Sequence, residues 1–269
     1  MQKNRMKWIS ALLAATVLLA ALAMTACNSG KDQPPEPEVD PIDDNFRTFY
    51  QIFVGSFSDS NGDGIGDLRG IINRLDYLND GNIHSGESLG VQGIWLSPIF
   101  TSPSYHKYDA KDYYAIDWRF GTEEDLKELV TLCHERNVKV ILDLAINHTS
   151  NQHEWFLKFK EARVSGNTAD PYYDFYSCVT TADKVGGVTY QKIAGVDCWY
   201  ECNFSGSMPE LNCDNPEVRT AALDVAKHYP ELGVAGFRFD PVRYIYFGDT
   251  ARSVDFRECS MTGLRAVKP

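Results

Sequence analysis

Short apolar runs, separated by longer mixed segments, form the main pattern along this chain. Residues 49–54, 91–98, 138–148 and 234–237 hold the most continuous of these runs, and each has a length suited to one buried strand. Segments with apolar residues at helical spacing lie between them. Strands that alternate with helices in this way predict a parallel sheet with right-handed crossovers, which is an α/β fold.

The connecting segments carry recognisable helix signals. Apolar residues at positions 68, 71, 72, 75 and 78 mark one face of a helix after the first strand. Thr122, with Asp125 three residues on, predicts the capped start of a second helix. Asn215 and Pro216 give a cap and a first-turn proline for a third, which runs toward His228. The apolar stripe expected on the second helix consists of Leu126, Leu129, Val130 and Cys133.

One connection is too long for a simple loop. About seventy residues, rich in Tyr, Gly, Asn and Cys, separate the third strand, ending near Asp143, from the helix at Pro216. A structureless loop of that length is unusual inside a compact domain. The pattern therefore predicts an inserted domain between these two elements.

The amino terminus has the pattern of a targeting segment. Lys3, Arg5 and Lys7 precede an apolar run over residues 8–26. This run is long enough to span a bilayer, so an uncleaved membrane anchor is one interpretation. Small residues followed by Cys27 instead favour the processing of a bacterial lipoprotein, which leaves Cys27 as a lipidated first residue. We therefore expect an exported protein, anchored to the membrane through Cys27 at the cell surface or in the periplasm.

Charge limits the classes of partner. The formal net charge is −11 at pH 7, which argues against nucleic acid or an anionic membrane surface. Residues 31–44 contain six acidic residues and one basic residue, so five of the excess negative charges lie there. The same stretch is rich in proline and predicts an extended, solvated spacer. With 43% hydrophobic and 12% aromatic residues, the rest of the chain can bury a sizeable core.

The chain contains seven cysteines, and Cys27 is one of them. Cys133 falls on the apolar face of a predicted helix, which is typical of a core residue. A zinc site is one interpretation of the others, but their spacings do not match a finger or ribbon, and no histidine lies among them. In an oxidising compartment we expect one or two disulfides, and four cysteines allow three connectivities. The four that lie close together in sequence are Cys178, Cys198, Cys202 and Cys213.

The segment after the first strand is a candidate cation loop. Asp59, Asn61 and Asp63 place oxygen-bearing side chains at every second position, and intervening glycines permit a tight turn. A loop of this kind can wrap a hard cation such as calcium. The match to an EF-hand ends at Gly70, where a bidentate Glu is required, so we expect Asp67 as the late ligand. The alternative is an ordinary turn rich in Asn, Asp and Gly.

Polar side chains stand where two of the strands end. Arg238 and Asp240 are two residues apart, so strand alternation puts them on one face. At the carboxyl end of a parallel strand, an arginine keeps a neighbouring carboxylate ionised and aimed, as a nucleophile requires. An isolated pair of this kind can also be a structural ion pair. The third strand leads through Asp143 to Asn147 and His148.

Tyrosines follow the second strand, and Tyr105 and Tyr108 are candidates for sugar binding. Sugar rings offer C–H bonds, which form an apolar, slightly positive surface suited to an aromatic face. The same run of tyrosines is also compatible with core packing.

Together, the four strand segments and their polar ends resemble the α-amylase family of retaining glycoside hydrolases, from about Phe49 to Asp249. The resemblance implies an α/β fold, the (β/α)8 TIM barrel, incomplete here with its first four strands and with an irregular insertion domain after strand 3. Glu210 lies in a short segment similar to the family's motif near the end of that insertion, where Asp is common. We expect a lipoprotein signal peptide at 1–26, an acidic Pro-rich linker at 27–45, barrel at 46–150, insertion at 151–213, barrel to strand 4 at 214–250, and a tail without resemblance at 251–269.

The resemblance also implies roles for individual residues. It makes Asp240 the nucleophile and Arg238 the cation that orients it and contacts substrate. His148 hydrogen-bonds the reacting sugar, and Tyr108 stacks against it. The supporting residues are Asp143, which holds the arginine, and Asn147, which braces a calcium or the inserted domain. The implied calcium ligands are the side chains of Asp59, Asn61, Asp63 and Asp67 and the carbonyl of Ile65.

These roles predict an exported hydrolase of α-1,4-glucans, such as starch and maltooligosaccharides, that works by double displacement on Asp240. Retention needs a second carboxyl about 5 Å away, which in the family ends the fifth strand. That glutamate, and an aspartate with a histidine after the seventh strand, have no counterpart here. We therefore expect a truncated form without activity by itself. The alternatives are an α-glucosidase or transglycosylase on short oligosaccharides, and a non-catalytic, truncated glycan-binding product.

Overall fold

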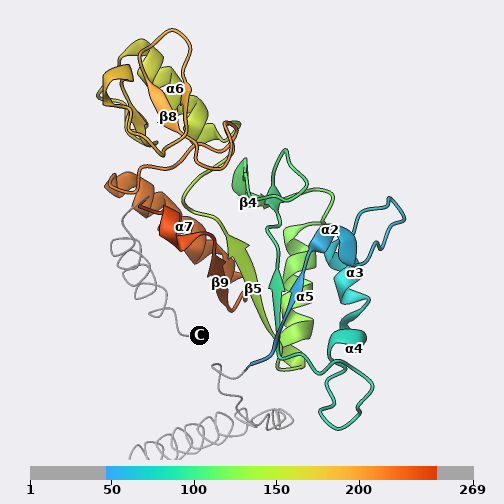
Figure 1. The fold of residues 1–269 in the computed structure, drawn as a ribbon. Helices are drawn as coiled ribbons and strands as arrows, with labels where there is room; N and C mark the ends of the chain where they lie inside the picture. The colour runs from blue at the N-terminus through green and yellow to red at the C-terminus, as the bar shows by residue number, and fades with distance from the viewer. Residues whose placement is uncertain (1–46, 247–269) are drawn as a thin grey trace, which may run out of the picture. The chain divides into compact units, whose positions relative to one another are not determined.

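The computed structural model describes residues 47–246, and its main sheet is parallel, as the sequence predicted. Strands β1 (Phe49–Ile52), β2 (Gly93–Leu96), β5 (Lys139–Leu144) and β9 (Gly236–Phe239) form a four-stranded sheet in that order (Figure 1). Each neighbouring pair is parallel. The carboxyl ends of the four strands therefore meet at one edge of the sheet, which is where the predicted site residues begin.

Helices connect these strands. The short helix α2 (Val54–Phe57) follows β1, α5 (Glu123–Glu135) precedes β5, and α7 (Pro216–Glu231) precedes β9. The predicted capping box at Thr122 and Asp125 is present, with both reciprocal hydrogen bonds. The Asn215 side chain accepts the backbone N–H of Glu217, as expected for a helix cap. The predicted apolar stripe of α5 is buried, which confirms the face that packs into the core.

The helix predicted over residues 68–78 is divided in two. The segment forms α3 (Leu68–Ile72) and α4 (Leu75–Leu78), and the leucines of both helices are buried as predicted. The backbone of Arg74 (φ −114°, ψ 11°) departs from helical values and separates them. The apolar period of the sequence identified the buried face, but it could not reveal this break.

Close backbone contact explains one glycine at the start of α3. A Cβ added at Gly70 would lie 1.9 Å from the carbonyl oxygen of Ser58. The amide of Gly70 donates to Asp67, which caps the helix. Residue 70, where an EF-hand would require a glutamate, is therefore a packing position between α3 and the preceding loop.

The strand boundaries also differ slightly from the predictions. The predicted first strand ends early because Val54 begins α2, where its N–H donates to the Ser97 hydroxyl. The fourth strand begins two residues later than predicted, at Gly236. After β2, a small antiparallel pair forms from β3 (Phe100–Thr101) and β4 (Asp112–Ile116).

The long connection between β5 and α7 is more regular than its sequence indicated. It contains helix α6 (Glu154–Ser165), which begins at the His153 cap and ends at Gly166 in the left-handed region (φ 68°). A three-stranded antiparallel sheet follows, in the order β6-β8-β7 (Figure 1). Its elements are β6 (Cys178–Val179), a 3-10 turn η2 (Thr181–Asp183), β7 (Tyr190–Lys192) and β8 (Trp199–Glu201).

Hydrogen bonds join this inserted segment to the end of β5. Isolated bridges pair His148 with Glu210 and Tyr176 with Leu211. The carbonyl of Asn147 also accepts the N–H of Leu211 at 2.7 Å. The returning end of the insertion is thereby placed against the residues that follow β5. A last 3-10 turn, η3 (Val242–Tyr244), follows β9.

The five cysteines within residues 47–246 are free thiols in this structure. Cys133 is fully buried on α5, as predicted for a core residue. Over the same residues, none of the helices has the length and apolar character needed to cross a membrane. Cys27, the signal peptide, the linker and the tail lie outside the described residues.

Candidate active site

Asp143 and Arg238 are direct neighbours in the parallel register of β5 and β9. The Arg238 Nη1 atom lies 3.3 and 3.2 Å from the two carboxylate oxygens of Asp143. The same atom lies 2.7 Å from Oδ1 of Asp240, the first residue after β9. One guanidinium group therefore bridges two carboxylates at the carboxyl edge of the sheet, and Arg238 and Asp240 share the face that strand alternation predicted.

The two carboxylates differ in their access to solvent. The Asp143 side chain is fully buried, whereas that of Asp240 is 28% exposed. Burial raises the pKa of Asp143, and the positive charge of Arg238 opposes this rise. The geometry suits Asp143 to holding the arginine and leaves Asp240 open to a substrate.

Two further side chains donate to Asp143. The Tyr108 hydroxyl lies 3.0 Å from Oδ2 of Asp143, and the indole Nε1 of Trp95 lies 3.1 Å from the same atom. Burial, together with the negative charge of Asp143, raises the pKa of Tyr108, so its hydroxyl stays protonated and donates. The guanidinium of Arg238 lies over the Trp95 ring, 5.1 Å from its centroid.

Trp95 was not among the predicted site residues. The feature that could have indicated its role is its indole N–H. Trp95 lies on β2, and the neighbouring strand β5 carries Asp143. A buried indole N–H requires a hydrogen-bond partner. Only the sheet order reveals that this partner is Asp143.

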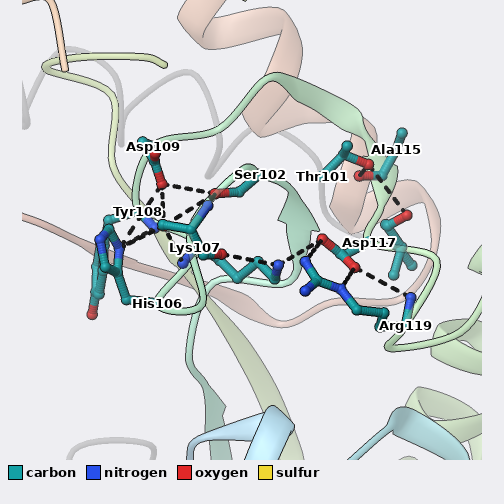
Figure 2. A network of polar contacts seen from close by, with 11 residues as sticks. Thr101, Ser102, His106, Lys107, Tyr108, Asp109, Ala115, Asp117 and Arg119 are labelled. Carbon is teal, nitrogen blue, oxygen red and sulfur yellow. Dashed lines mark hydrogen bonds and ion pairs between the residues drawn. The ribbon is translucent and has the colours of Figure 1, made fainter. Parts of the chain in front are cut away.

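Tyr108 is carried by a loop with a dense polar network (Figure 2). Lys107 Nζ lies 2.7 Å from Asp117 Oδ2, and Arg119 Nε lies 2.8 Å from Oδ1 of the same carboxylate. Ser102 Oγ donates to Asp109 at 2.7 Å. Burial by itself would raise the pKa of Asp117. Hydrogen bonds from Arg119 and Lys107 outweigh this effect and lower that pKa to about 2.

Lys107 itself has an unusual backbone conformation, with φ at 67°. A residue with a side chain seldom adopts this left-handed region, and surrounding contacts must hold it there. Its Nζ also donates to the carbonyl of Ser104. Lys107 therefore anchors, from inside, the loop that presents Tyr108, a role that the sequence alone did not indicate.

His148 and Asn147 lie where β5 meets the inserted segment. The His148 side chain is buried, and its ring packs 5.3 Å from that of Phe204. Burial lowers the pKa of His148 to about 4, so the ring is neutral at pH 7. Its predicted role in binding a sugar stays a prediction.

Asn147 contacts the insertion directly. Its Nδ2 donates to Oε2 of Glu210 at 3.0 Å, and both residues are almost fully buried. Burial raises the pKa of Glu210 to about 8, and this carboxyl is therefore mostly protonated at pH 7. The sequence placed Glu210 in a motif but gave no partner for it.

Tyr105 is not part of this cluster. Its side chain is 77% exposed, and its ring packs edge-on against those of Phe53 and His106 at 6.0 and 5.6 Å. The other predicted substrate-binding residues lie on or beside β5 and β9. The role of Tyr105 in substrate binding stays a prediction.

The predicted calcium loop is an exposed turn bonded to its own backbone. Asp59 accepts the amides of Asn61, Gly62 and Gly64, while Asp63 accepts that of Ile65. Both oxygens of Asp67 are also engaged, with Ser60 and the start of α3. Within residues 47–246 no three acidic, histidine or cysteine side chains converge as a metal cluster. The loop has suitable oxygen ligands in sequence, and calcium binding stays a prediction.

Comparison with known proteins identifies the family. The sequence model of the protein family described as the α-amylase catalytic domain matches residues 51–264. Alpha-amylase 3 of Dictyoglomus thermophilum is 40% identical over 222 residues, covering 82% of this chain and 41% of that protein. Oligo-1,6-glucosidase of Bacillus cereus is 40% identical over 208 residues, covering 73% of this chain and 35% of that protein.

Solved structures agree with this match. Amy13B of Eubacterium rectale has a TM-score of 0.75 and 40% identity, over 84% of this chain and 42% of its own. The α-amylase from H. orenii has a TM-score of 0.72 and 43% identity, over 83% of this chain and 46% of its own. The chain thus spans less than half the length of these relatives, and its four parallel strands form the first part of a (β/α)8 barrel. With this fold and these motifs in the expected order, the chain belongs to the α-amylase family of glycoside hydrolases.

Proposed function

We propose that this chain contributes to the hydrolysis of α-1,4-glucans, such as starch and maltooligosaccharides, with retention of configuration at the sugar. The observation that carries the proposal is the placement of Arg238 between Asp240 and Asp143. Asp240 is the partly exposed carboxylate of the pair, and it stands at the sheet edge where barrel enzymes of this fold hold substrate.

Each residue of the cluster has a distinct part in this mechanism. Arg238 pairs with Asp240 at 2.7 Å and fixes the direction of its oxygens, so that one oxygen attacks the anomeric carbon of the sugar. Asp143 is too deeply buried to reach substrate and instead holds the guanidinium through two contacts. Tyr108, fixed through its hydroxyl, offers its ring face to the sugar.

A retaining mechanism also needs a group that protonates the leaving oxygen and later activates water. Asp143 does not fit this part, because it is buried and occupied by Arg238. His148 is neutral at pH 7 and is proposed to hydrogen-bond the sugar. We assign the acid and base to a carboxyl outside residues 47–246.

The test uses this chain joined to the second half of the barrel of an α-amylase relative. Release of reducing sugar from soluble starch is measured, and Asp240→Asn should lower the rate by on the order of 10³-fold or more, as loss of other nucleophiles does. Asp224→Asn is the matched control, because Asp224 is 54% exposed on α7. Mass spectrometry of the protein during turnover should detect a glycosyl group on Asp240.

Three results would bear on the roles proposed for Asp240 and for the acid. Turnover that survives Asp240→Asn contradicts the role of this residue. Inverted product configuration contradicts the retaining mechanism. Starch hydrolysis by the purified 269-residue chain, lost on Asp240→Asn, would show that the acid lies within these residues.

A second candidate is an α-glucosidase or transglycosylase on short oligosaccharides. It is supported by the oligo-1,6-glucosidase match, whose 40% identity equals that of the α-amylase match. Product analysis separates the two candidates: an amylase converts soluble starch faster than maltotriose, whereas the alternative favours maltotriose or isomaltose. Binding to starch without any turnover would favour a non-catalytic glycan-binding protein.

We also propose that the protein is exported and anchored by a lipid on Cys27, and that the loop around Asp59 binds calcium. Support for the first is the charged and apolar amino terminus. Support for the second is the alternation of oxygen ligands at Asp59, Asn61 and Asp63. Calcium bound there would hold these oxygen ligands together and stabilise the loop.

A further inference from the structure

Two cysteines of the inserted segment lie on the same face of its antiparallel sheet. Cys178 in β6 stands opposite Tyr200 in β8, and Cys198 lies two residues before Tyr200. Because side chains two residues apart on a strand point to the same face, Cys178, Tyr200 and Cys198 share one face. Cys198 and Tyr200 are buried, while Cys178 is partly exposed.

The thiol groups of Cys178 and Cys198 are in hydrogen-bond contact with each other. This is the diagonal contact of an antiparallel pair, in which side chains reach across to the residue beside the one directly opposite. The hydrogen bond from Cys178 lowers the pKa of Cys198, and it raises that of Cys178. Arg163 of α6 lies close enough to lower the pKa of both thiols through its positive charge.

Cys202 is placed less favourably for a bond to either of these two cysteines. Cys198 and Cys202 flank β8 on either side, about 13 Å apart along the extended strand, which is too far for a disulfide between these two. The Cys202 thiol donates to the carbonyl of Thr189, next to β7, which flanks β8 on the side opposite β6 and Cys178. Cys133 lies on α5, outside the inserted segment.

We propose that Cys178 and Cys198 form a disulfide that crosslinks β6 to β8. Of the pairs that the four clustered cysteines could form, this is the one that the sheet register and the thiol contact support. The bond closes a loop that contains β7 and fixes the insertion as one unit. The inference is independent of the proposed hydrolase activity.

The reaction is an exchange with an external disulfide, either of oxidised glutathione or of a protein oxidant. The thiolate of one cysteine of the pair attacks the donor disulfide, which forms a mixed disulfide and releases one donor thiol. The thiolate of the second cysteine then attacks the protein sulfur of this mixed disulfide and displaces the second donor thiol. The two protein thiols are oxidised by two electrons, and the donor disulfide is reduced to two thiols.

The experiment uses the full chain equilibrated in oxidised and reduced glutathione, then denatured and alkylated. Peptide mapping should find Cys178 linked to Cys198, at a mass lower by two hydrogen atoms, with Cys133 and Cys202 alkylated. Cys178→Ser and Cys198→Ser should each leave the other thiol open to alkylation. Cys202→Ser is the matched control and should leave the link intact.

The melting temperature gives a second readout. Reduction should lower the melting temperature of the unmutated protein by several degrees, because the crosslink limits the unfolded chain, and it should not lower that of Cys178→Ser. The proposal is overturned if both thiols remain alkylated in the oxidising buffer, or if either cysteine is linked to a different partner. It is also overturned if glutathione stays attached to Cys178 while Cys198 is free.

Discussion

Lys107 and Asp117 form an ion pair of 2.7 Å in which each side chain is only 2% exposed. Removing one partner of such a pair leaves an uncompensated buried charge, which costs about 3–5 kcal/mol of stability. We expect Lys107→Met to lower the free energy of unfolding by about 3 kcal/mol, the lower end of this range, because Arg119 continues to bind Asp117. Urea denaturation measures the change.

The matched control for this prediction is Lys127→Met. Lys127 pairs with Glu123 on the exposed surface of α5, so its loss should cost less than about 1 kcal/mol. An equal effect of the two substitutions would show that the Lys107 pair contributes no more than a surface pair. The pKa of Asp117 is lowered from 3.8 to about 2, so the stability it contributes is complete above pH 3.8 and is lost as pH falls through 2.

Glu210 should make the stability of the fold depend on pH. Its pKa rises from 4.5 to about 8 because the carboxyl is buried. The unfolded chain therefore releases this proton at lower pH than the folded chain, and stability falls as pH rises from 4.5 to 8. His148, lowered from 6.5 to about 4, contributes the opposite slope below pH 6.5. Between pH 6.5 and 8 the histidine no longer offsets the slope that Glu210 contributes.

The variant Glu210→Gln tests this directly. The amide has no proton to release in this range and keeps the acceptor that Asn147 uses. Thermal unfolding between pH 6.5 and 8 should show a decline in melting temperature for the unmutated protein and a flatter profile for the variant. Glu154→Gln serves as the control, because Glu154 is exposed on α6 and its pKa is lowered by the hydrogen bond from Lys158, so it should leave the slope between pH 6.5 and 8 unchanged. Identical slopes in the unmutated protein and Glu210→Gln would contradict the burial effect.

Calcium should raise the melting temperature of the protein if the loop at residues 59–67 binds it. A ligand that binds the folded state alone stabilises it by mass action, by about 2.7 kcal/mol at a hundred times the dissociation constant. Asp63→Asn should weaken the response, since it removes one ligand charge in the loop. Asp76→Asn, at an exposed position on α4, is the control. Equal melting temperatures in calcium and in chelator would rule out a stabilising site.

Lipid attachment at Cys27 predicts that the protein incorporates labelled palmitate in a bacterial host. Cys27→Ala should abolish the label and release the protein from the membrane fraction, because no acyl chain remains to hold it. Cys133→Ala, a core position on α5, should keep the label. An unlabelled parent protein would contradict the lipoprotein interpretation.

Local pattern was sufficient for the order of the main elements. The four strands, the capped helices at Thr122 and Asn215, and the buried face of residues 68–78 all follow from spacing and capping residues. Helix α6 was missed because its buried residues, Phe156, Phe159 and Ala162, form a narrow stripe in an otherwise polar segment. Its burial depends on aromatic partners such as Tyr176 and Tyr200, which come from later in the chain.

The sequence by itself determined which residues stand at the strand ends, because strand length and alternation are local properties of the chain. It thereby placed Asp143, Arg238 and Asp240 at one edge of the sheet before any contact was known. Only the tertiary structure decided that Trp95 and Tyr108 both donate to Asp143, that Lys107 is anchored by Asp117, and that Glu210 meets Asn147. These partners depend on strand order and on the return of the insertion to β5. A hydrogen bond between distant segments leaves no periodic signal along the chain.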